Sequence, residues 1–196
     1  MKDNWNEYQT KTMNNKEIPP YLKFALKKFE EIKGIMVDLG CGAGTISEFL
    51  IKLGWKVIAI DKDTDVIEAR NKELINSSNS KLCIQKSDFK DCNIPRNDLV
   101  YANFSIPFCK REEFDKLWQK IHKSISINGR FAGVFFGIND DWKDRKDITF
   151  LKKQDVLKLF DNFKIEYFVE AEYDDKTALG KEKHWHNFRV VAKKIK

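Results

Sequence analysis

The sequence lacks any hydrophobic run long enough to cross a membrane, which takes about 18 consecutive apolar residues or more. Residues 1–19 are polar and contain no apolar stretch of the kind that a secretory signal needs. Hydrophobic residues make up 42% of the chain and charged residues 34%, which is typical of a globular domain and not of a disordered chain. We therefore expect a soluble protein with no membrane partner.

Cysteine is scarce, and its four copies are far apart in the chain. Cys41, Cys83, Cys92 and Cys109 form no Cys-x-x-Cys pair, so their spacing indicates neither a disulfide framework nor a structural zinc site. This pattern favours a reduced, cytoplasmic protein that holds no metal.

Internal repeats and low-complexity segments are absent as well. A chain of 196 residues corresponds to one domain, and we expect that domain to span residues 20–196, after a polar segment at residues 1–19. The net charge of +6 permits a nucleic-acid partner, but the lysines are interleaved with acidic residues. A nucleic acid is therefore possible but not favoured.

Strand patterns alternate with helical patterns along the chain. We predict strands at residues 35–39, 56–60, 82–85, 98–103 and 130–136, and helices at residues 20–33, 45–53, 63–75, 111–124 and 154–160. Strands separated by helices indicate a parallel sheet with helices on both faces. Two final strands, at residues 164–171 and 188–192, are joined by a long polar loop and predict an antiparallel edge hairpin. The expected fold is α/β, with a seven-stranded, mostly parallel sheet.

The turn after the first predicted strand holds the most informative residues. Gly40, Gly42 and Gly44 alternate there, just before the helix that begins at Thr45. Glycine permits positive φ angles and lets a ligand approach the main chain. Ligands of open parallel sheets bind beyond the carboxyl ends of the strands, where this turn lies. The spacing matches neither the phosphate-binding P-loop nor the dinucleotide pattern Gly-x-Gly-x-x-Gly.

Two acidic residues accompany the glycines. Asp38 precedes them, and Asp61 ends the second predicted strand, where an acid is suited to accept hydrogen bonds from the two hydroxyls of a ribose. Asp38 favours a cationic ligand group and would repel a pyrophosphate. A sulfonium with an amino-acid tail meets both conditions, whereas a nicotinamide-dependent oxidoreductase is disfavoured.

At these residues the chain resembles the class I S-adenosylmethionine-dependent methyltransferases. The segment VDLGCGAGT at residues 37–45 resembles their first motif, and Asp61 resembles the ribose-binding acid of their second motif. Ser87-Asp88-Phe89 follows the third predicted strand, where the family places an acid that meets the adenine amino group. The resemblance implies a Rossmann-like fold and S-adenosyl-L-methionine as cofactor. It implies these cofactor-binding residues: Asp38, Gly40, Cys41, Gly42, Gly44, Thr45, Asp61, Lys62, Asp88, Phe89 and Asn103.

Later segments resemble a compact bacterial group within this family, the tellurite-resistance-type and related small-molecule methyltransferases. These segments are LVYANFSIPFC at residues 99–109, GRFAGVFFG at 129–137, DITF at 147–150 and TALGKEKHWHNFRVVAKK at 177–194. The label says little about the substrate.

Three residues are candidates for a catalytic role. Asn103 ends the fourth predicted strand, and ANFSIPF at residues 102–108 is similar to the Asn-Pro-Pro-Tyr signature of amino methyltransferases, although two residues separate Phe104 from the proline. His184 and His186 would point to the same side of a strand, and they are the first candidates for a base if the acceptor needs one.

Four aromatic residues are further candidates around the acceptor. We interpret Trp142 and Phe150 as walls of its site, and Trp5 and Tyr8 as parts of a lid formed by the polar N-terminal segment. The leading hypothesis is a methyltransferase acting on a small molecule, because 196 residues leave no separate substrate domain. An RNA or protein methyltransferase and a non-catalytic S-adenosylmethionine-binding module remain as alternatives.

Overall fold

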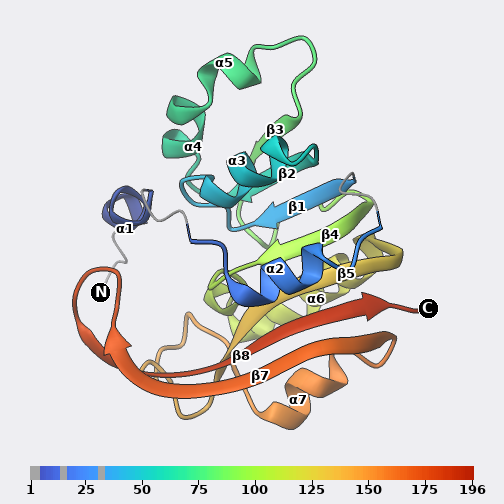
Figure 1. Ribbon diagram of the computed structural model, residues 1–196. Coiled ribbons are helices and arrows are strands. Elements are labelled where there is room, and N and C mark those ends of the chain that lie inside the picture. Colours follow the sequence, from blue (N-terminus) through green and yellow to red (C-terminus); the bar gives the residue numbers. More distant parts are fainter. Residues whose placement is uncertain (1–4, 14–16, 31–33) are drawn as a thin grey trace.

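The computed structural model describes residues 5–13, 17–30 and 34–196 (Figure 1). The strands are β1 (Ile35–Leu39), β2 (Lys56–Asp61), β3 (Leu82–Lys86), β4 (Asn97–Ala102), β5 (Ile125–Gly137), β6 (Phe150–Leu151), β7 (Phe163–Lys176) and β8 (Glu182–Lys194). The helices are α1 (Trp5–Thr12), α2 (Pro20–Leu26), α3 (Thr45–Lys52), α4 (Asp65–Arg70), α5 (Lys72–Ile75), the short 3-10 helix η1 (Ile106–Phe108), α6 (Arg111–Ser124) and α7 (Lys153–Lys158).

The strands form one mixed sheet in the order β3-β2-β1-β4-β5-β8-β7. Strands β1 to β5 pair in parallel, and β8 runs antiparallel between β5 and β7. The predicted α/β fold, with a mostly parallel sheet and an antiparallel edge, is therefore confirmed. One short strand was not predicted: β6 pairs with β5 through Phe136–Phe150 and Gly137–Leu151.

Helices cover both faces of this sheet. Alternate strand residues pack against α2, α3 and α4 on one face, in a core that includes Leu22, Leu50 and Ile67. The other strand residues pack against α6 and α7, in a core that includes Phe114 and Val156. Because strands between two helical layers bury both faces, the parallel strands are apolar almost throughout, and this explains why the sequence located them well.

The two final strands are much longer than predicted. β7 and β8 pair from Phe163–Lys194 as far as Lys176–Glu182, and Figure 1 shows the hairpin curving outward beyond the other strands. The predicted polar loop is therefore largely strand. Its outer half is exposed and charged, so it lacks the alternation of apolar residues by which a buried strand is recognised.

Two predicted helices differ from the observed ones. Helix α2 ends at Leu26, and the chain continues in a tight turn in which the Lys28 and Phe29 amides donate to carbonyls three residues earlier. The end of that prediction, residues 31–33, lies outside the described residues. The helix predicted at 63–75 is divided at Asn71, whose side chain donates to the carbonyl of Ile67 (2.9 Å).

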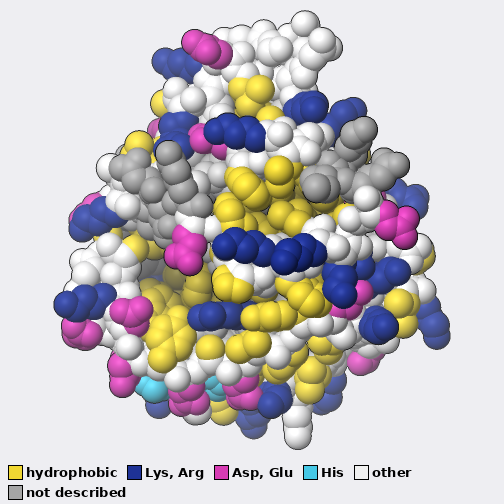
Figure 2. Space-filling model, in the orientation of Figure 1, with side chains coloured by type: hydrophobic (Ala, Val, Ile, Leu, Met, Phe, Trp, Pro, Cys, Tyr) yellow, Lys and Arg dark blue, Asp and Glu magenta, His cyan; other side chains and the backbone are white. Residues whose placement is uncertain are grey.

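Surface charge is mixed on the face that α2 covers. Figure 2 shows Lys and Arg side chains spread among acidic and hydrophobic ones over the described part of this face. Among the described helices, none combines the length and the apolar character that crossing a bilayer demands.

Candidate functional site

A cavity of about 300 Å³ lies at the carboxyl ends of the parallel strands. It is lined by residues that follow β1, β2, β3 and β4, together with side chains from α1, from the start of α6 and from the loop after β5. Of the residues predicted to bind the cofactor, these line the cavity: Gly40, Gly42, Asp61, Lys62, Asp88, Phe89 and Asn103.

The glycine turn is shaped to leave main chain exposed to this cavity. Gly40 and Gly42 have φ angles of +78° and +52°, which side chains disfavour. A Cβ atom on Gly40 would lie 2.2 Å from the Cβ of Ser105, so this glycine is required by packing. A Cβ atom on Gly42 would be no closer than 3.9 Å to Gln9, so this glycine leaves space beside the cavity.

Asp61 is fixed by the same turn. The Gly42 amide donates to one carboxylate oxygen (2.8 Å), and the Asp63 amide donates to the other (3.1 Å). Burial raises the pKa of the Asp61 carboxyl, while these two hydrogen bonds act in the opposite direction. The side chain is therefore held in one orientation at the edge of the cavity, where further lone pairs can accept hydrogen bonds from a ligand.

Asp38 lies behind the turn and does not line the cavity. It is buried, with 3% of its surface exposed, and the Ser47 hydroxyl donates to its carboxylate (2.6 Å). Burial raises the pKa of the Asp38 carboxyl to about 7, against the effect of the Ser47 hydrogen bond. The structure therefore places Asp38 behind the lining of the cavity, from where its charge can act on the cavity only from a distance.

Three other predicted residues of the turn support it from outside the cavity. A Cβ atom on Gly44 would lie 2.5 Å from the Ile67 side chain, so Gly44 serves helix packing. Burial raises the pKa of the Cys41 thiol well above its usual range, which makes it a packed and inert group. The Thr45 hydroxyl donates to the carbonyl of Met13 (3.4 Å) and so joins the turn to the N-terminal segment.

Asp88 and Phe89 follow β3 at the side of the cavity next to Asp61. The Phe89 amide donates to the Asp88 carboxylate (2.7 Å), and the Asp88 side chain is exposed. The Phe89 ring approaches Gly40, since a Cβ atom there would be 3.5 Å from it. Both residues line the cavity, and their role in binding adenine stays a prediction.

Asn103 follows β4 directly and lines the cavity. Its side-chain oxygen accepts a hydrogen bond from the Tyr21 hydroxyl of α2 (2.6 Å). Burial raises the pKa of the Tyr21 hydroxyl well above its usual range, so this hydroxyl remains a donor. Tyr21 therefore fixes the amide of Asn103, a contact that the sequence did not indicate.

The two histidines do not reach the cavity. His184 lies on the exposed hairpin between Asp174 (2.7 Å) and Glu172 (3.2 Å). His186 is buried, and its Nδ1 accepts a hydrogen bond from the Asn139 amide (3.1 Å). The structure therefore does not place His184 or His186 at the cavity, because the extension of β8 carries both beyond it.

The N-terminal helix reaches the cavity through Tyr8 and Gln9. The Gln9 side chain donates to the carbonyl of Asp63 (3.2 Å), and Arg70 donates to the carbonyl of Met13 (3.1 Å). Tyr8 therefore lines the cavity, and its role in a lid stays a prediction; the side chain of Trp5 is outside the described part of the chain. Gln9 was not predicted, since a polar residue in a polar segment gives no signal.

The predicted aromatic walls, Trp142 and Phe150, lie one layer behind the cavity surface. Trp142 contacts Phe108, which lines the cavity (ring centroids 6.2 Å apart), and Phe150 stacks on Phe136 (6.1 Å). Ser105 and Asp147 also line the cavity and were not predicted. Within the described residues, no group of three His, Cys, Asp or Glu side chains is arranged to hold a metal.

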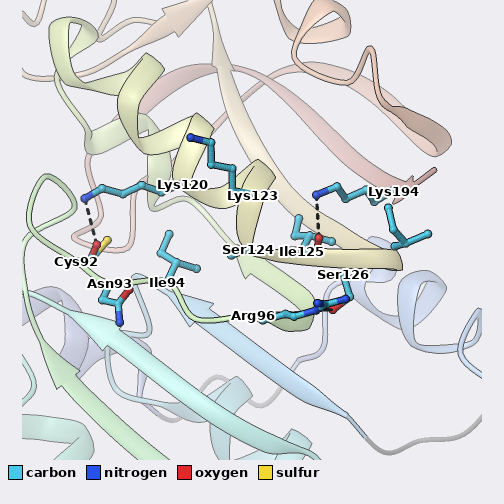
Figure 3. Close-up of a pocket in the computed structure, with 11 residues that line it drawn as sticks. Cys92, Asn93, Ile94, Arg96, Lys120, Lys123, Ser124, Ile125, Ser126 and Lys194 are labelled. Atoms are coloured by element: carbon cyan, nitrogen blue, oxygen red, sulfur yellow. Dashed lines mark hydrogen bonds between the residues drawn. The ribbon is translucent and has the colours of Figure 1, made fainter. Parts of the chain in front are cut away.

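A second hollow, of about 520 Å³, lies at the other end of α6 (Figure 3). Its basic side chains serve the main chain: Lys120 donates to the carbonyl of Cys92 (3.1 Å), and Lys194 donates to that of Ile125 (2.9 Å). Such lysines satisfy carbonyls at the end of a helix and in the adjoining loop. The hollow contains none of the predicted site residues, and we place the functional site at the glycine turn.

Residues 36–129 match a family described as a methyltransferase domain. Curated relatives carry the name carboxy-S-adenosyl-L-methionine synthase. The protein of Histophilus somni is 26% identical over 109 residues, covering 53% of this chain and 45% of that protein. The protein of Nautilia profundicola is 30% identical over 111 residues, covering 54% and 46%. The chain thus spans about half the length of the curated relatives that it matches.

Solved structures share the fold over nearly the whole chain. TehB from Haemophilus influenzae has a TM-score of 0.78 at 17% identity, covering 97% of this chain and 67% of that one. The 1,6-didemethyltoxoflavin-N1-methyltransferase of Burkholderia thailandensis, solved with 1,6-didemethyltoxoflavin and S-adenosylhomocysteine, has a TM-score of 0.69 at 14% identity. The alignment covers 99% of this chain and 82% of the Burkholderia protein.

Proposed function

We propose that this chain, a class I S-adenosylmethionine-dependent methyltransferase by its domain and its fold, transfers methyl groups to a small-molecule acceptor. The observation that carries this proposal is the contact between Gly42 and Asp61. The Gly42 amide holds the Asp61 carboxylate at 2.8 Å in the wall of a cavity that Asn103, Phe104 and Phe108 also line. The wall formed by Gly42 and Asp61 is thus suited to the adenosine part of the cofactor, and the wall formed by the residues after β4 is left for the acceptor.

The residues present fit the cofactor. Gly42 leaves room for a ligand against the main chain, Asp61 can accept from ribose hydroxyls, and Asp88 can accept from an adenine amino group. When bound, the cofactor supplies a methyl group on a sulfonium, which passes to a lone pair of the acceptor while the sulfur keeps the electrons of the broken S–C bond. The carboxylate of Asp61, and that of Asp38 in its ionised form, favour that positive charge.

This chain's own residues contribute by orientation and by excluding water. Alignment of two reactants can lower a barrier by roughly 7–11 kcal/mol, so a methyltransferase needs no nucleophile or triad. Tyr8 and Gln9 cover the cavity from α1, and Tyr21 fixes Asn103 beside it. With both histidines outside the cavity, an acceptor atom that carries a proton would release it to water or to a carboxylate at the cavity rim, such as Glu113.

A small acceptor suits the size and charge of the site. The cavity is bounded by α1, and its rim carries both signs of charge, including Lys90, Lys110, Glu113 and Asp147. The mixed charge of the described face in Figure 2 also differs from the basic face expected for RNA. These features favour a small molecule over RNA or a protein.

Calorimetry with S-adenosylmethionine, S-adenosylhomocysteine and NAD, followed by a labelled-methyl transfer assay over small amines, thiols, oxyanions and bulk RNA, tests the proposal. We expect the first two ligands to bind and NAD not to bind, with label appearing on a small acceptor. Binding of NAD alone would refute the proposal. Binding without transfer to any acceptor would indicate a non-catalytic module, and label on RNA would indicate the macromolecular alternative.

Asp61→Ala provides the matched test of the site. Loss of the carboxylate removes hydrogen bonds to the ligand, and we expect cofactor affinity to fall by about 1–3 kcal/mol. Asp174→Ala, on the exposed hairpin, is the control and should bind as the parent protein does. The curated relatives are named for the synthesis of a carboxylated form of the cofactor, so the reaction products need to be identified by mass spectrometry. Methyl transfer predicts S-adenosylhomocysteine as the product, whereas a carboxylated sulfonium would contradict the proposal.

A further inference from the structure

We propose, on the basis of the methyltransferase function above, that the acceptor is a planar, uncharged heteroaromatic compound that binds against Phe104 and Phe108. Both side chains line the cavity and both are half-buried, so part of each ring surface is presented to the space inside. The inference adds a substrate class to the site, and it can fail while the cofactor assignment stands.

The order of the strands divides the cavity into two halves. Gly40, Asp61 and Asp88 follow β1, β2 and β3, which lie side by side at one end of the parallel part of the sheet. Phe104 and Phe108 follow β4, on the side of β1 away from β2. A cofactor spread over the first three strands therefore leaves the half with the phenylalanine rings to the acceptor.

Phe104 is held in a conformation that ordinary residues avoid. Its φ angle is +49°, and among the described residues only Asn128 shares this property without being glycine. Left-handed backbone at a bulky residue costs free energy and persists only where its surroundings impose it, often at binding sites. Here the surroundings are Trp185 and Phe136, whose rings lie 5.6 Å and 6.0 Å from that of Phe104.

A second aromatic layer supports the first. Phe108 contacts Phe136 (5.9 Å) and Trp142 (6.2 Å), and Trp142 contacts Trp185 (5.7 Å), all between ring centroids. Edge-to-face and tilted ring contacts of this kind hold each ring in a defined plane. The wall is therefore a rigid apolar surface, suited to a flat molecule rather than a flexible chain.

The cation that such rings would attract is already part of the protein. The Lys183 ammonium lies 3.8 Å from the Trp185 ring centroid and 4.5 Å from that of Trp142. It pairs with Asp140, and both side chains are buried. The indoles of the second layer, which attract cations most strongly, therefore serve an internal ammonium, and only the phenylalanine rings Phe104 and Phe108, which attract cations less strongly, face the cavity. This favours a neutral ring system over a quaternary ammonium compound or a polyamine.

Polar groups remain at the rim for the edge of such a ring. Lys110, Glu113 and Asp147 line the cavity near Phe108 in the chain or across the opening, and they offer both donors and acceptors. Ring nitrogens and carbonyls at the edge of a heteroaromatic molecule require both kinds of partner.

Calorimetry on the protein saturated with S-adenosylhomocysteine tests the inference. The probes are quinazoline-2,4-dione, its fully saturated analogue with the same polar groups, phenyltrimethylammonium and spermidine. We expect the planar dione to bind about tenfold more tightly than any of the other three. Phe108→Leu should weaken its binding about tenfold, while Phe168→Leu, at a half-buried phenylalanine of β7, should change it less than about twofold.

The inference would be overturned by equal binding of the planar and saturated diones, by tighter binding of a cation, or by unchanged binding of the dione in Phe108→Leu. Absence of dione binding would also overturn it. A bulk-RNA arm of the transfer assay separates a free heteroaromatic compound from a base within RNA. Failure of S-adenosylhomocysteine to bind would instead refute the proposed function, so the two failures are distinguishable.

Discussion

At the scale of residues, three glycines allow two effects of an added side chain to be distinguished: strain in the backbone and loss of the space that a ligand would occupy. Gly40, Gly42 and Gly180 all have positive φ angles. A Cβ atom on Gly180 would meet nothing within 4 Å, one on Gly42 would meet Gln9 at 3.9 Å, and one on Gly40 would collide with Ser105 at 2.2 Å. Substitution by alanine should therefore cause backbone strain alone at Gly180, strain and loss of ligand space at Gly42, and strain and a steric clash at Gly40.

We expect Gly180→Ala to lower the free energy of unfolding by roughly 1–2 kcal/mol, the cost of left-handed backbone, without changing cofactor affinity. Gly42→Ala should lose a similar amount of stability and also lower affinity for S-adenosylhomocysteine about tenfold, because the methyl group enters the ligand's space. Gly40→Ala should lose the most stability. Urea unfolding and calorimetry measure both quantities, and an unaltered affinity in Gly42→Ala would contradict the placement of the cofactor.

The raised pKa of Asp38 predicts that both the stability of the protein and its affinity for the cofactor depend on pH. Its pKa of about 7 lies above its usual value of about 3.9, so the folded protein binds the proton more tightly than the unfolded chain does. Stability from this group is present at low pH and falls as pH rises from about 4 to about 7. A positively charged cofactor favours the ionised form, so its affinity should rise over the same range as binding releases a proton.

Calorimetry at about pH 6 in two buffers of different ionisation enthalpy measures that proton release. Asp38→Asn should abolish the release and flatten the pH dependence of both affinity and stability. Equal proton release by the variant and the parent would assign the effect to another group.

The sequence identified the residues whose role is local and missed those whose role depends on distant contacts. Gly42 and Asp61 were recognisable because a turn and a strand end place them at the cavity without other help. Gln9 and Tyr21 meet the site from elements far away in the chain, 54 residues from Asp63 and 82 residues from Asn103 respectively. No local pattern encodes such pairings.

At the scale of elements, α1 and the residue that follows it contact the rest of the domain through hydrogen bonds that include Gln9 to Asp63 and Arg70 to Met13. Removal of residues 1–13 should leave the unfolding transition of the domain in place and speed dissociation of S-adenosylhomocysteine by about tenfold, since Tyr8 and Gln9 cover the cavity. Stopped-flow displacement measures the rate.

Lys11→Ala is the control for this truncation, because its ion pair with Glu7 is exposed and contributes little. It should leave dissociation unchanged. If the truncated protein also releases the ligand at the parent's rate, α1 is not a lid.

The loop after β5 is fixed to β8 by the buried pair of Asp140 and Lys183. Asp140 also accepts hydrogen bonds from the amides of Trp142 (3.0 Å) and His186 (3.3 Å). Lys183→Met leaves a buried carboxylate without its partner and should lower the free energy of unfolding by about 3–5 kcal/mol. The double variant Lys183→Met/Asp140→Asn removes both charges and should regain most of that loss in urea unfolding. A double variant as unstable as the single one would show that the charges themselves are required.

The same hairpin marks where sequence reasoning about elements reached its limit. Strands β1 and β4 are buried along most of their length, and the four strands β1 to β4 were located within a residue or two. The outer half of β7, which includes Glu172 and Asp174, pairs only with β8 and is exposed. Its charged side chains are compatible with a loop or a strand, and only the pairing with β8 decides between them.

At the scale of the whole molecule, the two ends of the sheet have different roles. The carboxyl ends of the parallel strands carry the glycine turn, the acids and the aromatic wall. The opposite end, in Figure 3, uses Lys120 and Lys194 to satisfy main-chain carbonyls. This division follows from parallel strand direction, since ligand loops gather where the strands end. It was predictable from the alternation of strands and helices, whereas the strand pairing that brings Trp185 behind Phe104 was not.

A crystal structure of the protein grown with S-adenosylhomocysteine tests the central claim most directly. The account predicts the ribose hydroxyls within hydrogen-bond distance of Asp61, the main chain of Gly40 and Gly42 against the ligand, and the sulfur facing the half of the cavity that Asn103 and Phe104 line. Ligand density in the hollow of Figure 3, or a ligand turned so that Asp61 contacts only water, would contradict it.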